Sequence, residues 1–582
     1  MKGYYDIIIC GGGLAGQTLA RQLKINHPDV SVLILIKDKF PMPVATCKVG
    51  ESTVEIAGFY FAESLCLHDY FKNNHFTKMG LRYFYSNDKP FSERPEIGLS
   101  SFSPYDSFQI DRGIFENDLY NLNIMEGVEM VENVSVKDIE LSKSKALHEV
   151  SYIDIDSKNE TTVKGKWVID AMGRRNFLQK KLDLKIPVEK NCNSAWFRVD
   201  GRLDVDDFVS RDDKNYHQRV GHKSRYFSTT HLMGTGYWVW IIPLASGKTS
   251  VGIVTYDEIH PFATYNTQRK AFEWLEKYET TLFDHVRGLE LLDFKLVRNF
   301  ASKSKQIFSE DRWACVGDAA MFSDAFYSPG SNLIGFENSI VTKMVGLDMN
   351  NKLYPDTVAR FNDFAISHND WLIETVHQAY SYFGEEHIMS LNYLWDIVTG
   401  WAIIAPNMFN DIYLDDMKSR EIRKVTATFS SLSVRVKQLF KEWEKVTNRT
   451  FTFKFIDYLS VPFVKEIYKR NLSTGKSIDE LVEDMRQNVV VLENFARAIF
   501  LLAIEDAFPD KMDEIDDFAT IDGHAVSLRP EVWTRDGLFE EGKMINRELF
   551  DDIRTQLVAI YHFKGKADRV EQSLETTFSF DF

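Results

Sequence analysis

The stretch Ile7-Ile8-Ile9-Cys10-Gly11-Gly12-Gly13-Leu14-Ala15-Gly16 decides the fold, because it places a glycine-rich turn directly behind an apolar run. Tyr5 to Cys10 has the composition of a buried strand. Gln17 to about Asn26 has helical periodicity, and Ser31 to Ile36 reads as a second strand. The order strand, glycine turn, helix, strand predicts a β-α-β unit of the Rossmann type.

The glycines of this turn fit the pattern G-x-G-x-x-G at Gly11, Gly13 and Gly16. The first glycine permits a tight turn, the second lets the backbone approach a pyrophosphate, and the third lets the helix pack closely on the strand. The N-terminus of the following helix would face the phosphate charge, and Leu14 and Ala15 of the turn are expected beside the cofactor. We therefore predict that this loop binds a dinucleotide.

The ribose partner is expected at the end of the second strand, where an acidic residue usually holds the hydroxyl groups. That strand runs on into Lys37 and Asp38, so Asp38 is the candidate, although it lies slightly late.

Two regions differ in their sequence patterns. Residues 1–345 read as the dinucleotide-binding domain, and within it about 80–110 and 185–300 are short runs rich in Tyr, Phe, Val and Trp, typical of an inserted antiparallel sheet. Residues 346–582 have few glycines and helical periodicity, as in Ser477 to Asp506, which begins with a predicted capping box. The predicted fold class is α/β, a Rossmann-like nucleotide-binding domain with an inserted antiparallel β-sheet and a helical C-terminal region.

The bulk properties exclude several function classes. The net charge of −16 disfavours nucleic acid and anionic membranes as partners. The start lacks the apolar region of a signal peptide, and the longest late apolar stretch, Ala498 to Ile504, is far shorter than the roughly 20 residues that span a bilayer. We therefore expect a cytoplasmic protein without integral membrane association. The five cysteines lack metal-type C-x-x-C spacing and suit reduced thiols, so no metal is expected: Cys10, Cys47, Cys66, Cys192 and Cys315.

Three further segments resemble flavoproteins of the hydroxylase and halogenase group, which implies FAD as the dinucleotide. Gln109 to Phe115 resembles the segment that places an arginine, here Arg112, near the flavin. Val168 to Arg174 resembles the D-x-x-G stretch of the group. Cys315-Val316-Gly317-Asp318-Ala319-Ala320 resembles the second FAD motif, in which Gly317 and Asp318 would contact the cofactor.

Trp238-Val239-Trp240-Ile241-Ile242-Pro243 resembles the W-x-W-x-I-P signature of flavin-dependent halogenases, the tryptophan halogenase-like superfamily, on Trp238, Trp240 and Pro243. Strand alternation alone would also place two tryptophans on one face. The resemblance implies a two-component oxidoreductase. A separate flavin reductase supplies FADH2, and oxygen and a halide ion, chloride or bromide, then yield hypohalous acid. The acid halogenates an electron-rich aromatic substrate, and the tryptophans keep that substrate away from the flavin.

The family transfers the halogen through a lysine, and two lysines compete for this role. Lys48 precedes Val49-Gly50-Glu51-Ser52, which resembles the flavin-facing strap, so Lys48, Val49 and Gly50 are expected beside FAD. Lys78 precedes a glycine and an aromatic strand, as the catalytic lysine of the family does, and we predict Lys78 as catalytic. A buried lysine can polarise hypohalous acid as an ammonium or form a haloamine as an amine.

The loop from Asp324 to Gly335 resembles the segment beside the flavin ring that binds halide through backbone N–H groups. Tryptophan halogenases carry a glutamate where Tyr327 stands, which favours a phenolic or pyrrole-like substrate, free or carrier-bound. Pro329 stands where the family offers an N–H, and proline has none. The halide is therefore expected at Gly330 and Ser331.

Other flavin chemistries stay open on these patterns. A single-component FAD aromatic hydroxylase or a halogenase-like flavin oxidoreductase is the main alternative. A reductase or cyclase of polyprenyl chains and a flavin-binding protein without turnover are further ones. The helical region closes the substrate pocket in the family, yet Trp371, Trp395 and Trp401 are expected mainly to pack in the core.

Overall fold

The computed structural model describes residues 3–44, 48–143, 146–189, 192–221, 224–515, 521–539 and 546–564. Its first sheet has the strand order β7-β2-β1-β10-β9-β8, and β18 pairs with β10. The strands are β1 (Tyr4–Cys10), β2 (Val32–Leu35), β7 (Glu129–Val131), β8 (Val134–Glu140), β9 (His148–Asp154), β10 (Glu160–Asp170) and β18 (Trp313–Cys315).

The predicted β-α-β unit is confirmed at the centre of this sheet. β1 pairs in parallel with β2 and β10, and Ile7, Ile8 and Ile9 are fully buried, as expected for a strand covered on both faces. Helix α1 (Leu14–Asn26) packs against α4 (Arg112–Met125) and α9 (Gly330–Met349). It begins three residues before the predicted start at Gln17, because the last glycine of the turn already belongs to its first turn.

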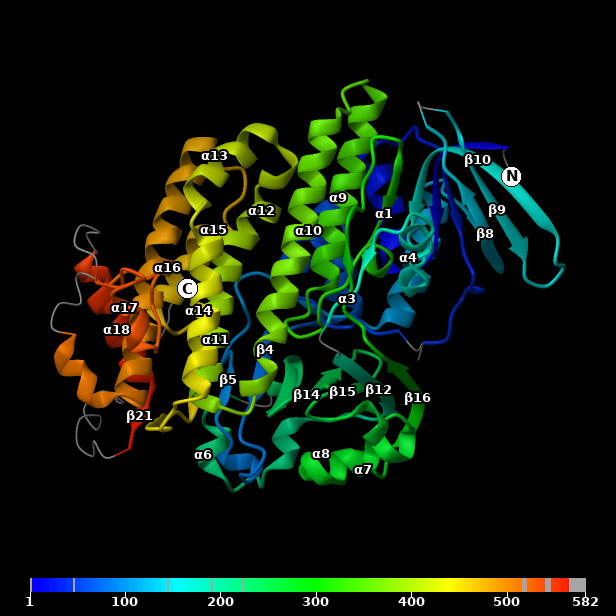
Figure 1. Ribbon diagram of the computed structural model, residues 1–582. Helices are drawn as coiled ribbons and strands as arrows, with labels where there is room; N and C mark the ends of the chain where they lie inside the picture. The colour runs from blue at the N-terminus through cyan, green and yellow to red at the C-terminus, as the bar shows by residue number, and fades with distance from the viewer. Residues whose placement is uncertain are drawn as a thin grey trace.

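The second sheet has the order β16-β12-β15-β14-β13-β4-β5-β20, and α7 (Gln268–Tyr278) and α8 (Thr280–Val286) lie below it in Figure 1. Its strands are β4 (Leu81–Phe84), β5 (Glu96–Gly98), β12 (Cys192–Asp200), β13 (Thr229–Gly234), β14 (Tyr237–Pro243), β15 (Thr249–Tyr256), β16 (Glu290–Val297) and β20 (Phe455–Asp457).

This sheet departs from the prediction in two ways. Most pairs are antiparallel, but β13 pairs with β4 and β20 pairs with β5 in parallel, because these partners come from distant segments and not from hairpins. β20 also belongs to the region expected to be helical. The C-terminal region therefore completes the edge of the second sheet.

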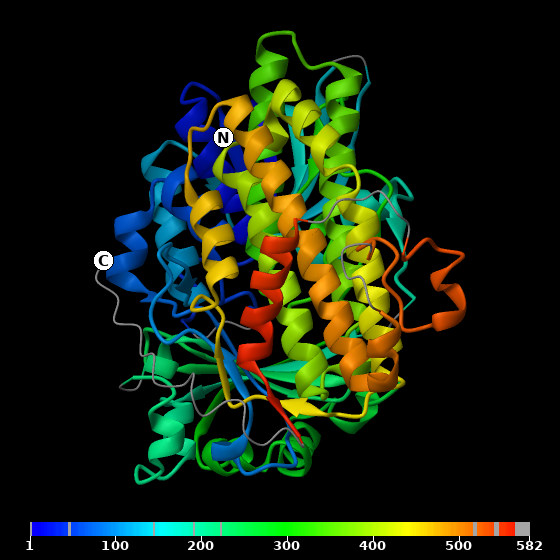
Figure 2. The same cartoon turned by 90° about the vertical axis from the view of Figure 1, so that its left-hand side faces the viewer.

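Most of the rest of the C-terminal region is helical, as predicted, and faces the viewer in Figure 2; two short strands, β19 (Phe451–Thr452) and β21 (His562–Phe563), pair with each other. The capping box is confirmed: the Ser477 side chain accepts from the Glu480 N–H, and the Glu480 carboxylate accepts from the Ser477 N–H. The main helices are α10 (Pro355–His377), α11 (Glu386–Thr399), α12 (Ala405–Phe409), α13 (Asp416–Thr426), α14 (Phe429–Glu444), α15 (Pro462–Leu472), α16 (Ile478–Ala507), α17 (Pro530–Trp533) and α18 (Arg547–Ile560).

Two helical segments are long and apolar enough to cross a membrane by length and composition, Glu386–Phe409 and Ile478–Ala507. Their apolar windows are 78% and 83% buried inside the protein, which is the behaviour of core helices. Within the part of the chain that the structure describes, Cys10, Cys66, Cys192 and Cys315 are not in disulfide bonds, and Cys47 lies outside the described residues.

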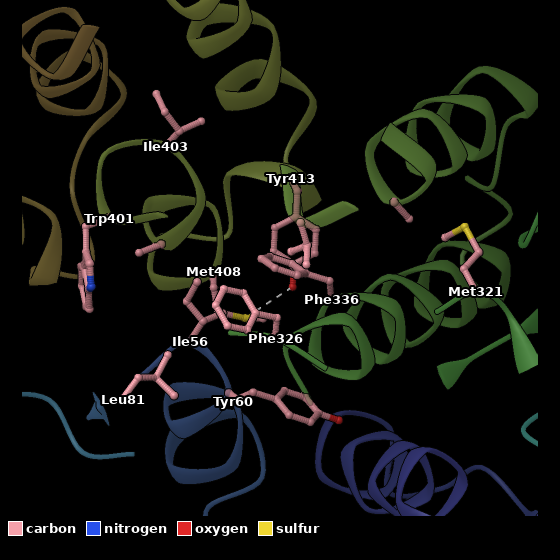
Figure 3. Packing of buried hydrophobic residues seen from close by; sticks show 14 of the residues in the cluster. Ile56, Tyr60, Leu81, Met321, Phe326, Phe336, Trp401, Ile403, Met408 and Tyr413 are labelled. Carbon is pink, nitrogen blue, oxygen red and sulfur yellow. Dashed lines mark hydrogen bonds between the residues drawn. The ribbon is translucent and has the colours of Figure 1, made fainter. Parts of the chain in front are cut away.

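The N-terminal and C-terminal regions share one hydrophobic core (Figure 3). Phe336 of α9 meets the ring of Tyr413 edge-on at 4.9 Å, and the Tyr413 hydroxyl contacts the Met408 sulfur at 3.9 Å. A Cβ at Gly335 would lie 2.9 Å from the Tyr60 ring, so a glycine is needed where α9 crosses Tyr60. The site described below lies on this shared core.

A buried charge cluster holds the edge of the second sheet. The Glu96 carboxylate contacts Arg82 and lies 2.7 Å from Arg225 Nε, and all three side chains are fully buried. Burial alone would raise the pKa of Glu96, but these two arginines hold that pKa below its usual range. Removal of one member of such a cluster leaves buried charge without compensation.

We expect Glu96→Gln to lower the free energy of unfolding by about 3 to 5 kcal/mol, because Arg82 and Arg225 would lose their shared carboxylate. Urea unfolding followed by circular dichroism measures the loss. Glu385→Gln is the matched control, since its partner Arg449 is 65% exposed and such pairs contribute about 1 kcal/mol or less. Equal losses in both variants would contradict the prediction.

Candidate functional site

Two adjacent cavities meet where the first sheet, the second sheet and the helical region join. The strand-side cavity is lined among others by Leu14, Gly50, Arg112, Trp238, Asp318 and Ser331. The helix-side cavity is lined among others by Glu55, Tyr327, Asn332, Trp371, Asp396 and Trp401.

The glycine loop leads directly to Leu14, which lines the strand-side cavity. Gly11 has φ +119°, and a Cβ there would lie 2.3 Å from the Ala171 carbonyl oxygen; a Cβ at Gly16 would lie 2.1 Å from the Gly11 carbonyl oxygen. Among the described residues, a Cβ at Gly13 would instead meet no atom within 4 Å, and no side chain caps the helix that follows. Open space at an uncapped helix N-terminus fits a pyrophosphate.

The second motif lies against this loop. Gly317 has φ +62°, and a Cβ there would lie 2.9 Å from Cβ of Ala15. Asp318 lines the strand-side cavity, and its carboxylate lies 3.5 Å from Nε of Arg174. The sequence segments around residues 11–16, 170–174 and 317–318 are therefore brought together.

The strap, residues 49–52, forms the side wall. The Arg112 guanidinium donates to the Val49 carbonyl at 2.7 Å, and the Ile110 N–H donates to the Glu51 carbonyl at 2.5 Å. Gly50 has φ +97°, a backbone conformation that favours glycine. Val49, Gly50 and Arg112 all line the strand-side cavity.

Lys78 lies behind the strap and is 1% exposed. Its ammonium donates to Ser52 Oγ at 2.8 Å and to the Thr53 carbonyl at 2.5 Å. Ser52 lines the strand-side cavity, and Val54 lines the helix-side cavity. Burial lowers the pKa of Lys78 to about 7, against the opposing effect of Glu55. Lys78 therefore contacts the segment that separates the two cavities.

Two ionisable neighbours of Lys78 were not found by sequence reasoning. Glu55 lines the helix-side cavity, and its carboxylate accepts a hydrogen bond from the Tyr468 hydroxyl at 3.4 Å. Burial raises the pKa of Glu55. His231 lines the strand-side cavity, and burial lowers the pKa of its ring to about 3, which keeps it neutral. A signal for Glu55 was its place directly after the strap; His231 lies in an ordinary strand pattern.

The loop after the second motif alternates between the cavities. Tyr327 and Pro329 line the helix-side cavity, whereas Ser328 and Gly330 line the strand-side cavity. Tyr327 has φ +60° and Ser328 has φ +53°, strained values for residues with side chains. The Asp324 carboxylate braces the loop, because it accepts from the Phe326 N–H at 2.9 Å and from the Tyr380 hydroxyl at 2.8 Å.

Pro329 is the N-cap of α9, and Gly330 and Ser331 form its first turn. The N–H groups of a first helical turn have no acceptor within the helix, and the helix dipole favours an anion there. Gly330 and Ser331 both line the strand-side cavity, so the N-terminus of α9 lies beside it although Pro329 has no N–H.

The tryptophans of the signature strand lie on β14, which ends at Pro243. Trp238 and Trp240 both line the strand-side cavity. Trp238 Nε1 donates to the Tyr380 hydroxyl at 3.2 Å, and Trp240 Nε1 donates to Ser250 Oγ at 3.1 Å. Their rings therefore form a fixed, bulky wall.

Five of the predicted cofactor residues line the strand-side cavity: Leu14, Val49, Gly50, Arg112 and Asp318. Gly11, Gly13, Ala15, Gly16 and Gly317 lie in the adjoining glycine turns, and Asp38 and Lys48 lie apart from the cavity. Asp38 is exposed beyond the end of β2. The Lys48 ammonium lies 2.5 Å from the buried carboxylate of Glu116, which also binds Arg112. Neither side chain lines the cavity wall.

The wall of the helix-side cavity comes from α10, α11 and a π-helical turn at Gly400–Ile404. Trp371 and Trp401 line it, so these two tryptophans face a cavity, whereas Trp395 is fully buried against Phe495, as expected for a core residue.

A family model described as tryptophan halogenase matches residues 67–382, more than half of the chain. A flavin-dependent halogenase of Dictyostelium discoideum, chlA, is 29% identical over 449 residues, which cover 71% of this chain and 72% of that protein. A Pseudomonas fluorescens chlorinase of 1H-pyrrole-2-carbonyl peptidyl-carrier protein is 26% identical over 56% of this chain and 72% of its own length.

Solved structures share the fold. Halogenase PltM in complex with phloroglucinol and FAD superposes with a TM-score of 0.58 at 16% identity, over 83% of this chain and 95% of PltM. The brominase Bmp2 gives a TM-score of 0.53 at 21% identity, over 66% of this chain and 89% of Bmp2. The predicted fold, enzyme class and FAD cofactor are confirmed at the level of the family. The chain belongs to the tryptophan halogenase family of flavin-dependent enzymes.

Proposed function

We propose that this enzyme halogenates an electron-rich phenolic or pyrrole-like ring, free or carrier-bound, by means of hypohalous acid that Lys78 presents to the substrate. The observation that carries the proposal is the buried Lys78 ammonium, which contacts the wall between the two cavities. Residues 1–345 would hold the cofactor and residues 346–582 would close the substrate pocket. The described cysteines form no disulfide bond, which suits the cytoplasm, where we propose that the enzyme works.

The strand-side cavity is the proposed FAD site. Gly13 would offer open backbone to the pyrophosphate, while Gly11, Gly16 and Gly317 would permit the tight turns and close packing around it. Asp318 would offer a carboxylate for hydroxyl groups. A separate flavin reductase would supply the reduced cofactor, and FAD bound there would supply the redox chemistry that converts oxygen and halide to hypohalous acid. Trp238 and Trp240 would keep the organic substrate out of this cavity.

The halide is proposed to bind at the N-terminus of α9, through the backbone N–H groups of Gly330 and Ser331. Helix N-termini bind anions because their N–H groups lack partners and their dipole is positive. The ion would thus lie on the cofactor side of the loop, while Tyr327 faces the substrate side.

The transfer step uses two groups of this chain. The ring carbon attacks the halogen, the O–X bond breaks, and the departing hydroxide takes a proton from the Lys78 ammonium to form water. The ring then loses its proton to the Glu55 carboxylate, which lies in the cavity wall and interacts electrostatically with Lys78. Return of that proton from Glu55 to Lys78 restores both groups.

Gly13→Ala tests the cofactor site. We expect FAD affinity to fall at least about tenfold, because the new methyl group would occupy space proposed for the pyrophosphate. The thermal midpoint of the apoprotein should stay unchanged, since a Cβ at Gly13 meets no atom within 4 Å. Gly288→Ala, also free of contacts, is the control for FAD titration by fluorescence quenching. Wild-type FAD affinity in Gly13→Ala would place the pyrophosphate elsewhere.

Lys78→Ala tests the transfer step. With a flavin reductase and halide, we expect halogenated product to fall at least about 100-fold, while FAD binding and release of free hypohalous acid persist. Mass spectrometry of product and a thiol trap for hypohalous acid make the two measurements. Lys89→Ala, which removes a lysine paired with Glu386, is the control. Full activity of Lys78→Ala would reject the assignment.

The pH dependence follows from the lowered pKa of Lys78. Below about pH 7 the side chain is an ammonium and can donate its proton, and above it the proton is lost. The transfer rate should therefore fall as pH rises through about 7. The rate at which Lys78→Ala releases hypohalous acid is measured over the same pH range. This control shows how much of the pH dependence comes from formation of hypohalous acid and not from its transfer. A transfer rate that rises through pH 7 would indicate the haloamine route instead.

A further inference from the structure

The wall of the helix-side cavity contains a buried ion pair. Asp396 of α11 lines the cavity, and its Oδ1 lies 2.5 Å from the Lys437 ammonium of α14. The two side chains are 6% and 3% exposed. Desolvation offsets most of the attraction within such a pair, so stability alone does not explain it.

Three donors converge on the Asp396 carboxylate. The Tyr327 hydroxyl donates to Oδ2 at 2.8 Å, the Asn392 amide donates to Oδ2 at 3.0 Å, and Lys437 donates to Oδ1. Lys437 also donates to Oδ1 of Asn392 at 2.7 Å, which fixes the orientation of the amide. Asp396 is therefore held as an acceptor.

This arrangement decides the direction of the Tyr327 hydroxyl. A phenol hydroxyl has one proton and two lone pairs, and here the proton is given to Asp396. Asn392 approaches the oxygen from 3.4 Å and engages at most one lone pair. Since Tyr327 lines the cavity, its hydroxyl can accept a hydrogen bond from a ligand but has no proton to donate.

We propose that Tyr327 recognises the substrate by accepting a hydrogen bond from a ring hydroxyl or ring N–H, and that Asp396, Asn392 and Lys437 are positioning residues that hold it in this state. The substrate class is therefore an aromatic ring that carries a free donor group. The inference rests on the proposed function, because it assigns the substrate to the helix-side cavity.

The same hydrogen bond would assist the reaction. Positive charge develops on the ring as the carbon–halogen bond forms, and a hydroxyl on that ring becomes more acidic. The hydrogen bond to Tyr327 then strengthens, and the linked hydrogen bonds from Tyr327 to Asp396 and from Lys437 to Asp396 strengthen it further by polarisation. An interaction that grows in the transition state raises the rate of the chemical step. An aryl methyl ether has no proton to offer and gains nothing from Tyr327.

The test compares resorcinol with 1,3-dimethoxybenzene, two electron-rich rings that differ in the donor proton. We expect Tyr327→Phe to lower kcat/KM for resorcinol about 10- to 100-fold, and to leave the value for the ether unchanged. Tyr265→Phe is the control, because it removes a buried hydroxyl, bonded to Thr255, from a separate hydrophobic cluster. Equal losses with both substrates would overturn the proposal.

Asp396→Asn distinguishes a positioning role for Asp396 from a purely structural role, because only a positioning role predicts a change in substrate preference. Its amide can donate to Tyr327, so the hydroxyl proton is freed to point into the cavity. The preference for resorcinol over the ether should then shrink at least about tenfold or reverse. A variant with uniformly reduced activity and an unchanged preference would count against the proposal.

Binding without turnover separates this inference from the proposed function. Titration calorimetry of the two compounds with the FAD-loaded enzyme, without reductant, should show tighter binding of resorcinol in the wild type and loss of that preference in Tyr327→Phe. If this pattern appears but no compound is halogenated, the proposed function fails and the Tyr327 site stands. If wild type binds both compounds equally, the Tyr327 site is rejected.

Discussion

The ammonium of Lys78 needs hydrogen bonds because burial removes its water, and it finds them on Ser52 and on the Thr53 carbonyl. Ser52 Oγ is also within hydrogen-bond distance of Thr229 at 2.8 Å and of Ser328 at 2.9 Å. One hydroxyl thus connects the lysine, the second sheet and the loop before α9. The separation of the two cavities depends on this junction, since the strap and the loop both meet there.

The loop before α9 directs two neighbouring side chains toward different cavities, Tyr327 to the helix side and Ser328 to the strand side. Both residues have left-handed backbone conformations. Such conformations persist only where the surrounding structure over-determines them. The Asp324 carboxylate and the start of α9 at Gly330 provide that support, and Pro329 suits the helix start because its φ is already restricted.

Both carboxylates that line the helix-side cavity accept hydrogen bonds from neighbouring side chains. The Glu55 carboxylate accepts a hydrogen bond from Tyr468, and the Asp396 carboxylate accepts hydrogen bonds from Tyr327, Asn392 and Lys437. An apolar cavity with a small number of fixed polar groups orients a ligand by those groups and excludes water with the rest. The same core that joins the N-terminal and C-terminal regions therefore also shapes the cavity (Figure 3).

Much of this protein was determined by local sequence patterns. The β-α-β unit, the capping box at Ser477 and the halogenase signature at Trp238 were predictable because periodicity, spacing and helix caps act over a few residues. The residues next to Lys78 along the chain indicate it as a candidate, whereas its burial beside the strap is a property of the tertiary structure. The parallel pairs of the second sheet and the place of β20 required the tertiary structure, because their partners are far apart in sequence. Asp396 and Lys437 lie on helices, where charged side chains usually face water, and only the packing of α11 against α14 decides that they meet in the wall of a cavity.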